Sequence, residues 1–188
     1  MKFRSIEKVN QGKFITRYDL TYETEKGNIK KYEMISRNGD CRSFDDIRSH
    51  KSEAVVLIIH DKDNSRILLN KEYRMAVGDI AINFPAGLID PGEDVETAAK
   101  RELWEETGLT LTSVKVKWPS SFSAVGIMNE RSEVVIGTAE GEFAPSTSDE
   151  EEISAAWYTK DEIKELLKTS ENFAARTQAY CYMWAYGA

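Results

Sequence analysis

Cysteine is scarce in this sequence of 188 residues. The two cysteines, Cys41 and Cys181, stand far apart in the chain and form no C-x-x-C pair. This spacing excludes a dense disulfide framework and the paired-cysteine metal sites of many small domains. We therefore expect two free thiols in a protein of a reducing compartment.

Long apolar runs and an excess of basic residues are also missing. No run approaches the ~18 apolar residues of a membrane-spanning helix, and the opening segment MKFRSIEKVNQGK lacks the apolar core of a signal peptide. Lysine and arginine together number 25 against 32 acidic residues, which gives a net charge of −7. We therefore expect a cytoplasmic protein that binds neither membranes nor nucleic acids, while a pocket for a small anionic substrate stays open.

Histidine is rare as well. Neither His50 nor His60 has an acidic partner at a useful spacing, and no Ser/His/Asp arrangement is visible. His60 ends a predicted buried strand, where a structural histidine is more common than a catalytic base. The sequence therefore gives no indication of a histidine-activated nucleophile.

Hydrophobic residues make up 41% of the chain, which suffices for the core of one domain with a small extension. Within residues 13–22, period-two spacing predicts a strand whose buried face carries Phe14, Thr16, Tyr18, Leu20 and Tyr22. Residues 29–37 are the expected returning strand of a hairpin. Later patterns predict strands at 53–60, 66–74, 111–118, 132–142 and 154–159, and helices at 94–107, 160–170 and 171–187. Because this order is not a repeated βαβ unit, we expect a mixed sheet with helices packed on its faces.

Three glutamates lie close together near the end of the predicted helix 94–107. Glu102, Glu105 and Glu106 have i, i+3 and i+4 spacing, so we expect them on one face, away from the apolar stripe that packs on the sheet. Like charges at this spacing repel one another, and the negative end of the helix dipole disfavours them again. A bound cation explains the cluster better than folding does.

Residues 87–109 read G-x5-E-x7-R-E-x2-E-E-x-G-L, a pattern that resembles the Nudix box. Its fixed positions are occupied by Gly87, Glu93, Arg101, Glu102, Glu105, Glu106 and Gly108, with Leu103 and Leu109 at the apolar positions. At background frequencies of ~5–10% per residue type, a chance match is rarer than about one in ten million. The resemblance implies an α/β fold, the Nudix-type α/β/α sandwich with a mixed sheet, here preceded by a small antiparallel N-terminal hairpin. It also implies hydrolysis of a diphosphate linked to another moiety.

The resemblance implies a role for each matching position. The expected ligands of Mg²⁺ or Mn²⁺ are the Ala86 carbonyl and the carboxylates of Glu102, Glu105 and Glu106. Arg101 and Glu93 are expected to orient these carboxylates, and Glu105 counts among the catalytic residues as well. Gly87 lies where backbone must come close to substrate or metal.

Features outside the box are similar to the ADP-ribose and nucleotide-sugar pyrophosphatase branch of the family. NFPAGLID resembles its entry to the box, and KEYRMAV resembles a strand end at which Arg74 would contact the substrate diphosphate. Glu130, in GIMNERS, matches a glutamate that lines the substrate site. In the loop DEEEIS, Glu151 is the preferred metal ligand or general base, with Asp149 second. Residues 1–45 resemble an extension that forms a homodimer and completes the substrate pocket, and residues 46–188 form the hydrolase domain.

The predicted function is divalent-metal-dependent hydrolysis of ADP-ribose or a related nucleoside diphosphate sugar to a nucleoside monophosphate and a sugar phosphate. Two alternatives stay open. One is a Nudix hydrolase of another class, acting on nucleoside triphosphates, dinucleoside polyphosphates or RNA caps. The other is a non-catalytic Nudix ligand sensor. The chain also departs from the branch pattern, with Asn83 for a glutamate before PAG, Glu72 for a glutamine and Val77 near the usual proline.

Overall fold

The protein is described from a computed structural model, which places residues 1–49, 51–169 and 172–187. The chain divides into two compact units, Met1–Glu53 with Ser120–Ser132, and Ala54–Pro119 with Glu133–Ala188. This division differs from the predicted boundary after residue 45, because a segment from the middle of the chain joins the N-terminal unit. Each unit has a buried core of its own.

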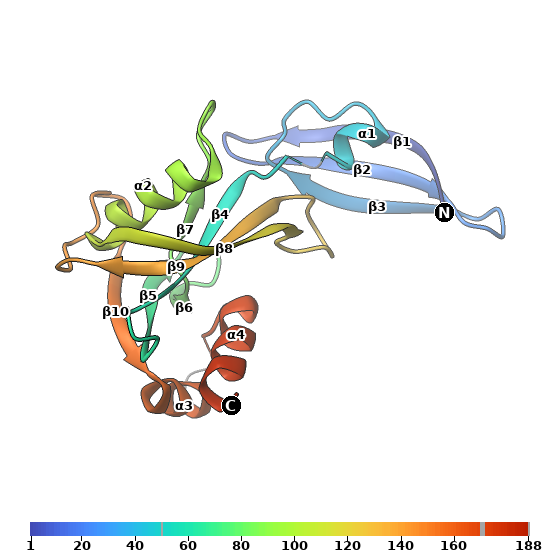
Figure 1. The fold of residues 1–188 in the computed structure, drawn as a ribbon. Coiled ribbons are helices and arrows are strands. Elements are labelled where there is room, and N and C mark those ends of the chain that lie inside the picture. The colour runs from blue at the N-terminus through green and yellow to red at the C-terminus, as the bar shows by residue number, and fades with distance from the viewer. Residues whose placement is uncertain (50, 170–171, 188) are drawn as a thin grey trace. The chain divides into compact units, whose positions relative to one another are not determined.

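The first unit contains a three-stranded antiparallel sheet in the order β1-β2-β3 (Figure 1). Its elements are β1 (Lys2–Gln11), β2 (Thr16–Glu23), β3 (Ile29–Ser36) and the short helix α1 (Phe44–Ile47). The predicted alternation along β2 is confirmed, since Tyr18 and Leu20 are buried. Phe14 lies before the strand and is exposed, so its predicted place on the buried face is wrong.

Strand β1 was not predicted, so the expected hairpin is a three-stranded sheet. Its pairing with β2 shifts register between Phe3 and Ser5 and again between Lys8 and Asn10. Each such bulge breaks the period-two pattern by which a strand is recognised in a sequence. β1 is also largely exposed, so few of its positions need apolar side chains.

Residues Ser120–Ser132 pack on the three-stranded sheet. The Ile35 N–H donates to the Ile127 carbonyl at 2.8 Å, and the hydroxyl of Tyr32 donates to the carbonyl of Gly126. These bonds tie the turn between β8 (Thr110–Phe122) and β9 (Arg131–Glu140) to β3. The sequence of this turn did not predict its contact with β3.

The second unit contains the larger mixed sheet. Its main path runs β10-β5-β4-β9-β8, with β6 paired to β5 and β7 paired to β4. The remaining strands are β4 (Ala54–His60), β5 (Arg66–Arg74), β6 (Asp79–Asn83), β7 (Ala86–Leu88) and β10 (Ile153–Thr159). All the strands predicted for this part of the chain are present, and β6 and β7 are two further short strands.

Helices cover both faces of this sheet, as Figure 1 shows. On one face, α2 (Val95–Thr107) buries Ala98, Ala99 and Leu103 against β4, β5 and β9. On the other face, α3 (Lys160–Thr169) and α4 (Ala175–Tyr186) contribute Ile163, Cys181 and Ala185 to a second core. The unit is therefore a three-layered α/β/α sandwich, as predicted.

The helix predicted over residues 171–187 begins later, at Ala175. Residues 170 and 171, at the predicted junction of the last two helices, and His50 lie outside the described residues. Among the described helices, none is both long and apolar enough to cross a membrane.

Candidate active site

Helix α2 begins and ends at the residues that the sequence indicated. The Asp94 carboxylate caps the helix by accepting the Thr97 N–H at 2.8 Å. Gly108 follows the last turn in the left-handed conformation, with a φ of 76°, which glycine adopts at little cost. These two caps fix the ends of the helix, and the packing of Ala98, Ala99 and Leu103 on the sheet fixes which face each glutamate presents.

Glu106 does not lie off the apolar stripe, contrary to the prediction. It is only 8% exposed and belongs to the buried face of the helix with Ala99 and Leu103. The spacing explains this position, because Glu106 follows Leu103 by three residues and Ala99 by seven. A charged side chain at such a position needs a specific partner.

Asn70 of β5 supplies one partner for Glu106. The Asn70 Nδ2 group donates to Glu106 Oε2 at 2.8 Å, and Asn70 itself is 1% exposed. Burial above all, together with the nearby charges of Glu102 and Glu72 and against the opposing effect of the Asn70 hydrogen bond, raises the pKa of Glu106 to about 9. The surroundings of Glu106 therefore disfavour its charged form in the protein alone.

Arg101 links the other carboxylates of the box. Its guanidinium donates to both Glu93 oxygens at 3.0 and 2.8 Å, to Glu102 at 2.8 Å and to Glu105 at 3.1 Å. It also donates to the Leu88 carbonyl at 2.9 Å. The expected contact between Arg101 and Glu105 is thus present, and the Arg101 guanidinium connects α2 with the loop before it.

Gly87 admits the carboxylate of Glu102. A Cβ atom at Gly87 would overlap that carboxylate, so no other residue leaves room for the observed position. Gly87 and Ala86 belong to β7, which pairs with Val55 and Val56 of β4. Burial raises the pKa of Glu102, while the Arg101 guanidinium opposes this effect. The expected close approach of backbone at Gly87 is therefore an approach to a box glutamate.

Glu72 is a further carboxylate of the site, and the sequence did not predict it as a site residue. It lies near the end of β5, and Arg74 donates to its Oε1 at 2.6 Å. Burial raises the pKa of Glu72, Arg74 opposes the effect, and Glu151 adds to it. A usable signal was present, because Glu72 follows Leu68 and Asn70 at period two on a strand with a buried face.

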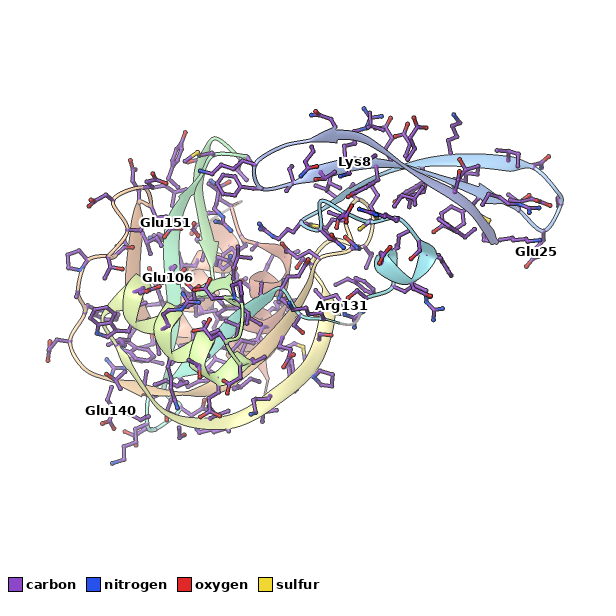
Figure 2. All side chains as sticks on the ribbon, turned by 90° about the horizontal axis from the view of Figure 1, so that it is seen from above. Lys8, Glu25, Glu106, Arg131, Glu140 and Glu151 are labelled. Carbon is purple, nitrogen blue, oxygen red and sulfur yellow. The ribbon has the colours of Figure 1, made fainter. Side chains whose placement is uncertain are left out.

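The acidic loop before β10 is attached at both of its ends. The Ala144 N–H donates to the Thr107 carbonyl and the Thr147 N–H to the Glu105 carbonyl, so the loop caps the last turn of α2. At the other end, the Tyr73 N–H donates to the Glu152 carbonyl. Glu151 is held between these anchors, close enough for its charge to raise the pKa values of Glu72, Glu102 and Glu106 after the effect of burial. Figure 2 labels Glu151 and Glu106 in this unit.

Another predicted position, Glu130, belongs to the first unit. It is half-buried and pairs there with Arg37. Tyr18 of the same unit is fully buried and donates to the Asn38 carbonyl, so it has no free face on which a nucleotide base could stack. Tyr22 is partly exposed and packs edge-on against Phe3.

The donor set of the second unit suits a hard divalent cation. No three acidic, histidine or cysteine side chains are grouped in ligating positions among the described residues. Instead, Arg101 holds Glu102 and Glu105, and Asn70 holds Glu106. Burial and the neighbouring carboxylates nevertheless raise the pKa values of Glu102 and Glu106, and the buried Asn70 Oδ1 has no hydrogen-bond partner in the described part of the chain. A group of oxygen ligands whose charges repel one another fits Mg²⁺ or Mn²⁺ after small rotations of the carboxylates.

Comparison with known proteins gives the family. The model of the NUDIX domain matches residues 50–179, more than half of the chain, so the protein belongs to the Nudix family. It is 33% identical over 128 residues to the ADP-ribose pyrophosphatase of Saccharomyces cerevisiae, covering 67% of this chain and 53% of that protein. It is 29% identical over 144 residues to the ADP-sugar pyrophosphatase of Mus musculus, covering 74% of this chain and 62% of that protein. The chain thus spans less than two thirds of the length of either relative.

A solved structure supports the fold. The crystal structure of an ADP compounds hydrolase superposes with a TM-score of 0.72 at 22% identity, covering 98% of this chain and 92% of the other. The predicted Nudix-type architecture is confirmed by this likeness, which extends over both units of the chain.

Proposed function

We propose that the protein hydrolyses the diphosphate bond of ADP-ribose or a related nucleoside diphosphate sugar, with a divalent cation, to give a nucleoside monophosphate and a sugar phosphate. The observation that carries this proposal is the cluster of carboxylates between α2 and β5, in which Glu72 and Glu102 lie close enough for their charges to act on the buried Glu106. The named activities of the yeast and mouse relatives support the substrate class.

The Ala86 carbonyl and the carboxylates of Glu102, Glu105, Glu106 and Glu151 would hold the cation, Mg²⁺ or Mn²⁺. Such a cation would supply neutralisation of the diphosphate charge and a more electrophilic phosphorus. Arg101 and Glu93 keep the carboxylates of Glu102 and Glu105 in place through the bonds described above. Gly87 leaves the space in which Glu102 lies.

The chain's own groups carry the remaining steps. Arg74, at the end of β5, binds the substrate diphosphate. A water oxygen forms a bond to one phosphorus while the bridging P–O bond breaks, and the leaving phosphate retains the bridging oxygen. Glu151 takes the proton of the attacking water, a role that suits an exposed carboxylate on a loop beside the buried acids.

The N-terminal extension, residues 1–45, is proposed to form a homodimer and to complete the substrate pocket, with Glu130 at that pocket and the hydrolase domain at residues 46–188. An apolar groove of about 570 Å³ supports an interaction role for the first unit. Aromatic and apolar side chains line it, among them Leu20, Tyr22, Tyr32, Met34, Phe122 and Met128. Size-exclusion chromatography with light scattering measures the dimer, and a monomer at micromolar concentration contradicts it.

We also propose a cytoplasmic location. Cys41 and Cys181 are both buried free thiols. Burial raises the pKa of Cys181 to about 12, so the thiolate that oxidises is scarce there. Fractionation of cells that produce the protein tests the location.

Product analysis tests the reaction. ADP-ribose incubated with the protein and Mg²⁺ in ¹⁸O-labelled water should give AMP and ribose 5-phosphate, with the label on only one of the two products. A parallel incubation with nucleoside triphosphates distinguishes the alternative class, which releases inorganic pyrophosphate. Pyrophosphate release with no turnover of any nucleotide sugar contradicts the proposed substrate, and tight binding without turnover of either indicates a sensor.

A further inference from the structure

One face of β5 changes from apolar to polar as the strand runs beneath α2. Leu68, Asn70 and Glu72 alternate with residues of the opposite face, since successive strand side chains point to opposite sides. Leu68 packs in the core shared with α2, and Glu72 pairs with Arg74. Asn70 stands between them as a polar residue at a core position, 1% exposed. A polar side chain that deeply buried requires an explanation.

The two polar ends of the Asn70 amide differ in their surroundings. Nδ2 donates to Glu106 Oε2 at 2.8 Å. Oδ1 is buried and has no hydrogen-bond partner within the described ranges of the chain. With Glu106 ionised, as a metal ligand must be, the opposite amide orientation would place Oδ1 against a carboxylate oxygen, two acceptors facing each other, so the contact with Glu106 then fixes the orientation.

We propose that Asn70 is a positioning residue of the cation site: its Nδ2 group fixes the Glu106 carboxylate, and its Oδ1 accepts a hydrogen bond from the hydration shell of the bound cation. This inference rests on the proposed function. Mg²⁺ and Mn²⁺ sites in proteins retain several waters, and each such water needs an acceptor. Glu106 would touch the cation, and Asn70 would act through Glu106 and through a water of the hydration shell.

A neutral amide is suited to this position. A leucine has the same branching pattern but neither holds the carboxylate nor accepts a hydrogen bond. An aspartate of the same shape offers oxygens only and repels an ionised Glu106. The asparagine amide combines a donor for the carboxylate with a separate acceptor atom for water.

The test is the Mn²⁺ affinity of the full chain without substrate, measured from the EPR signal of free Mn²⁺. Asn70→Leu should weaken Mn²⁺ binding by about 10–100-fold, the usual effect of removing a group that orients a metal ligand. Thr138→Val is the matched control. It removes another buried polar group, whose hydroxyl hydrogen-bonds with those of Thr112 and Ser113 at 3.0 Å, and should leave Mn²⁺ affinity unchanged.

A double-mutant cycle shows whether Asn70 acts through Glu106. In the Glu106→Gln background, Asn70→Leu should weaken Mn²⁺ binding clearly less than it does in wild type, because the carboxylate that Asn70 positions is gone and only the contact of Oδ1 with water is left to lose. Equal losses in both backgrounds mean a general structural effect and overturn the proposal. If Asn70→Leu does not fold, as judged by circular dichroism, Asn70→Ser replaces it, since serine is too short to reach Glu106.

The outcomes separate this inference from the proposed function. If wild type and Asn70→Leu bind Mn²⁺ equally while Glu106→Gln binds it at least tenfold more weakly, Asn70 is not a positioning residue and the metal site stands. If wild type itself does not bind Mn²⁺, the proposed function fails, and this inference fails with it.

Discussion

The Arg74 guanidinium donates to the Glu72 carboxylate at 2.6 Å, from two residues further along the same strand. Side chains at this spacing project from the same face of a strand. Glu72 is largely buried, whereas 52% of the Arg74 side chain is exposed. The buried partner therefore fixes one edge of the guanidinium and leaves the rest of its donors available to a ligand.

Arg74→Ala should raise KM for ADP-ribose by about tenfold or more with little change in kcat, because Arg74 binds the diphosphate equally in the ground state and the transition state. Steady-state kinetics at saturating Mg²⁺ measures both constants. Arg66→Ala is the matched control: Arg66 begins the same strand and pairs with Asp61 at 2.9 Å. Equal changes of KM in the two variants would mean that Arg74 does not bind the substrate.

Glu106→Gln should leave the metal-free protein as stable as wild type or make it more stable. The buried carboxyl has a pKa of about 9, so the folded state disfavours its charge, and glutamine keeps the shape without the charge. Thermal unfolding in EDTA at pH 8 measures the effect. Glu105→Gln provides the contrast, because it weakens a contact with Arg101 and should not raise stability. A lower melting temperature for Glu106→Gln alone would contradict the statement that the folded protein disfavours the charge of Glu106.

The stability of the fold should fall as the solution is acidified, through His60. Burial above all, together with the charge of Lys115, lowers the pKa of His60 to about 4. Between pH 6.5 and pH 4 the unfolded chain binds a proton that the folded protein does not, so the free energy of unfolding falls by about 3 kcal/mol across this window. His60→Gln removes this contribution, so its difference from wild type should change between pH 7 and pH 4 in urea unfolding. A constant difference would mean that His60 does not titrate in this way.

The acidic loop supplies a prediction that compares neighbouring carboxylates. Glu151→Gln should lower kcat by ~10²–10⁴-fold with KM nearly unchanged, the usual cost of losing a general base. Asp149→Asn and Glu152→Gln should lose much less, since neither is proposed to accept the proton. Steady-state kinetics on the three single variants gives the comparison. Small and equal effects would make the loop an ordinary solvated run of charge.

Much of the second unit was predictable because its signals are local. The buried strand β4, the cap at Asp94 and the left-handed Gly108 each follow from a few adjacent residues. In the first unit, β1 escaped prediction because its two register shifts disturb the alternation on which strand recognition depends. The short helix α1 was also missed, although Ser43 and Asp46 form its capping box.

The site was predictable along α2 but not across the sheet. The glutamates were evident from their spacing, yet the burial of Glu106 depends on how the helix is rotated over β5. Asn70 and Glu72 contribute through contacts with residues distant in the sequence. Such contacts leave a trace only in the period-two pattern of the strand, which carries no information on its partner.

The most direct test of the account is the rate at which AMP forms from ADP-ribose in matched reactions of wild type and Glu106→Gln, each with Mg²⁺ and with excess EDTA. The account predicts that wild type forms AMP only when Mg²⁺ is present. With Mg²⁺, Glu106→Gln should form AMP at a rate lower by about 10³-fold or more, because the buried carboxylate that helps hold the cation is lost. Undiminished AMP formation by wild type in EDTA, or by Glu106→Gln with Mg²⁺, would contradict it.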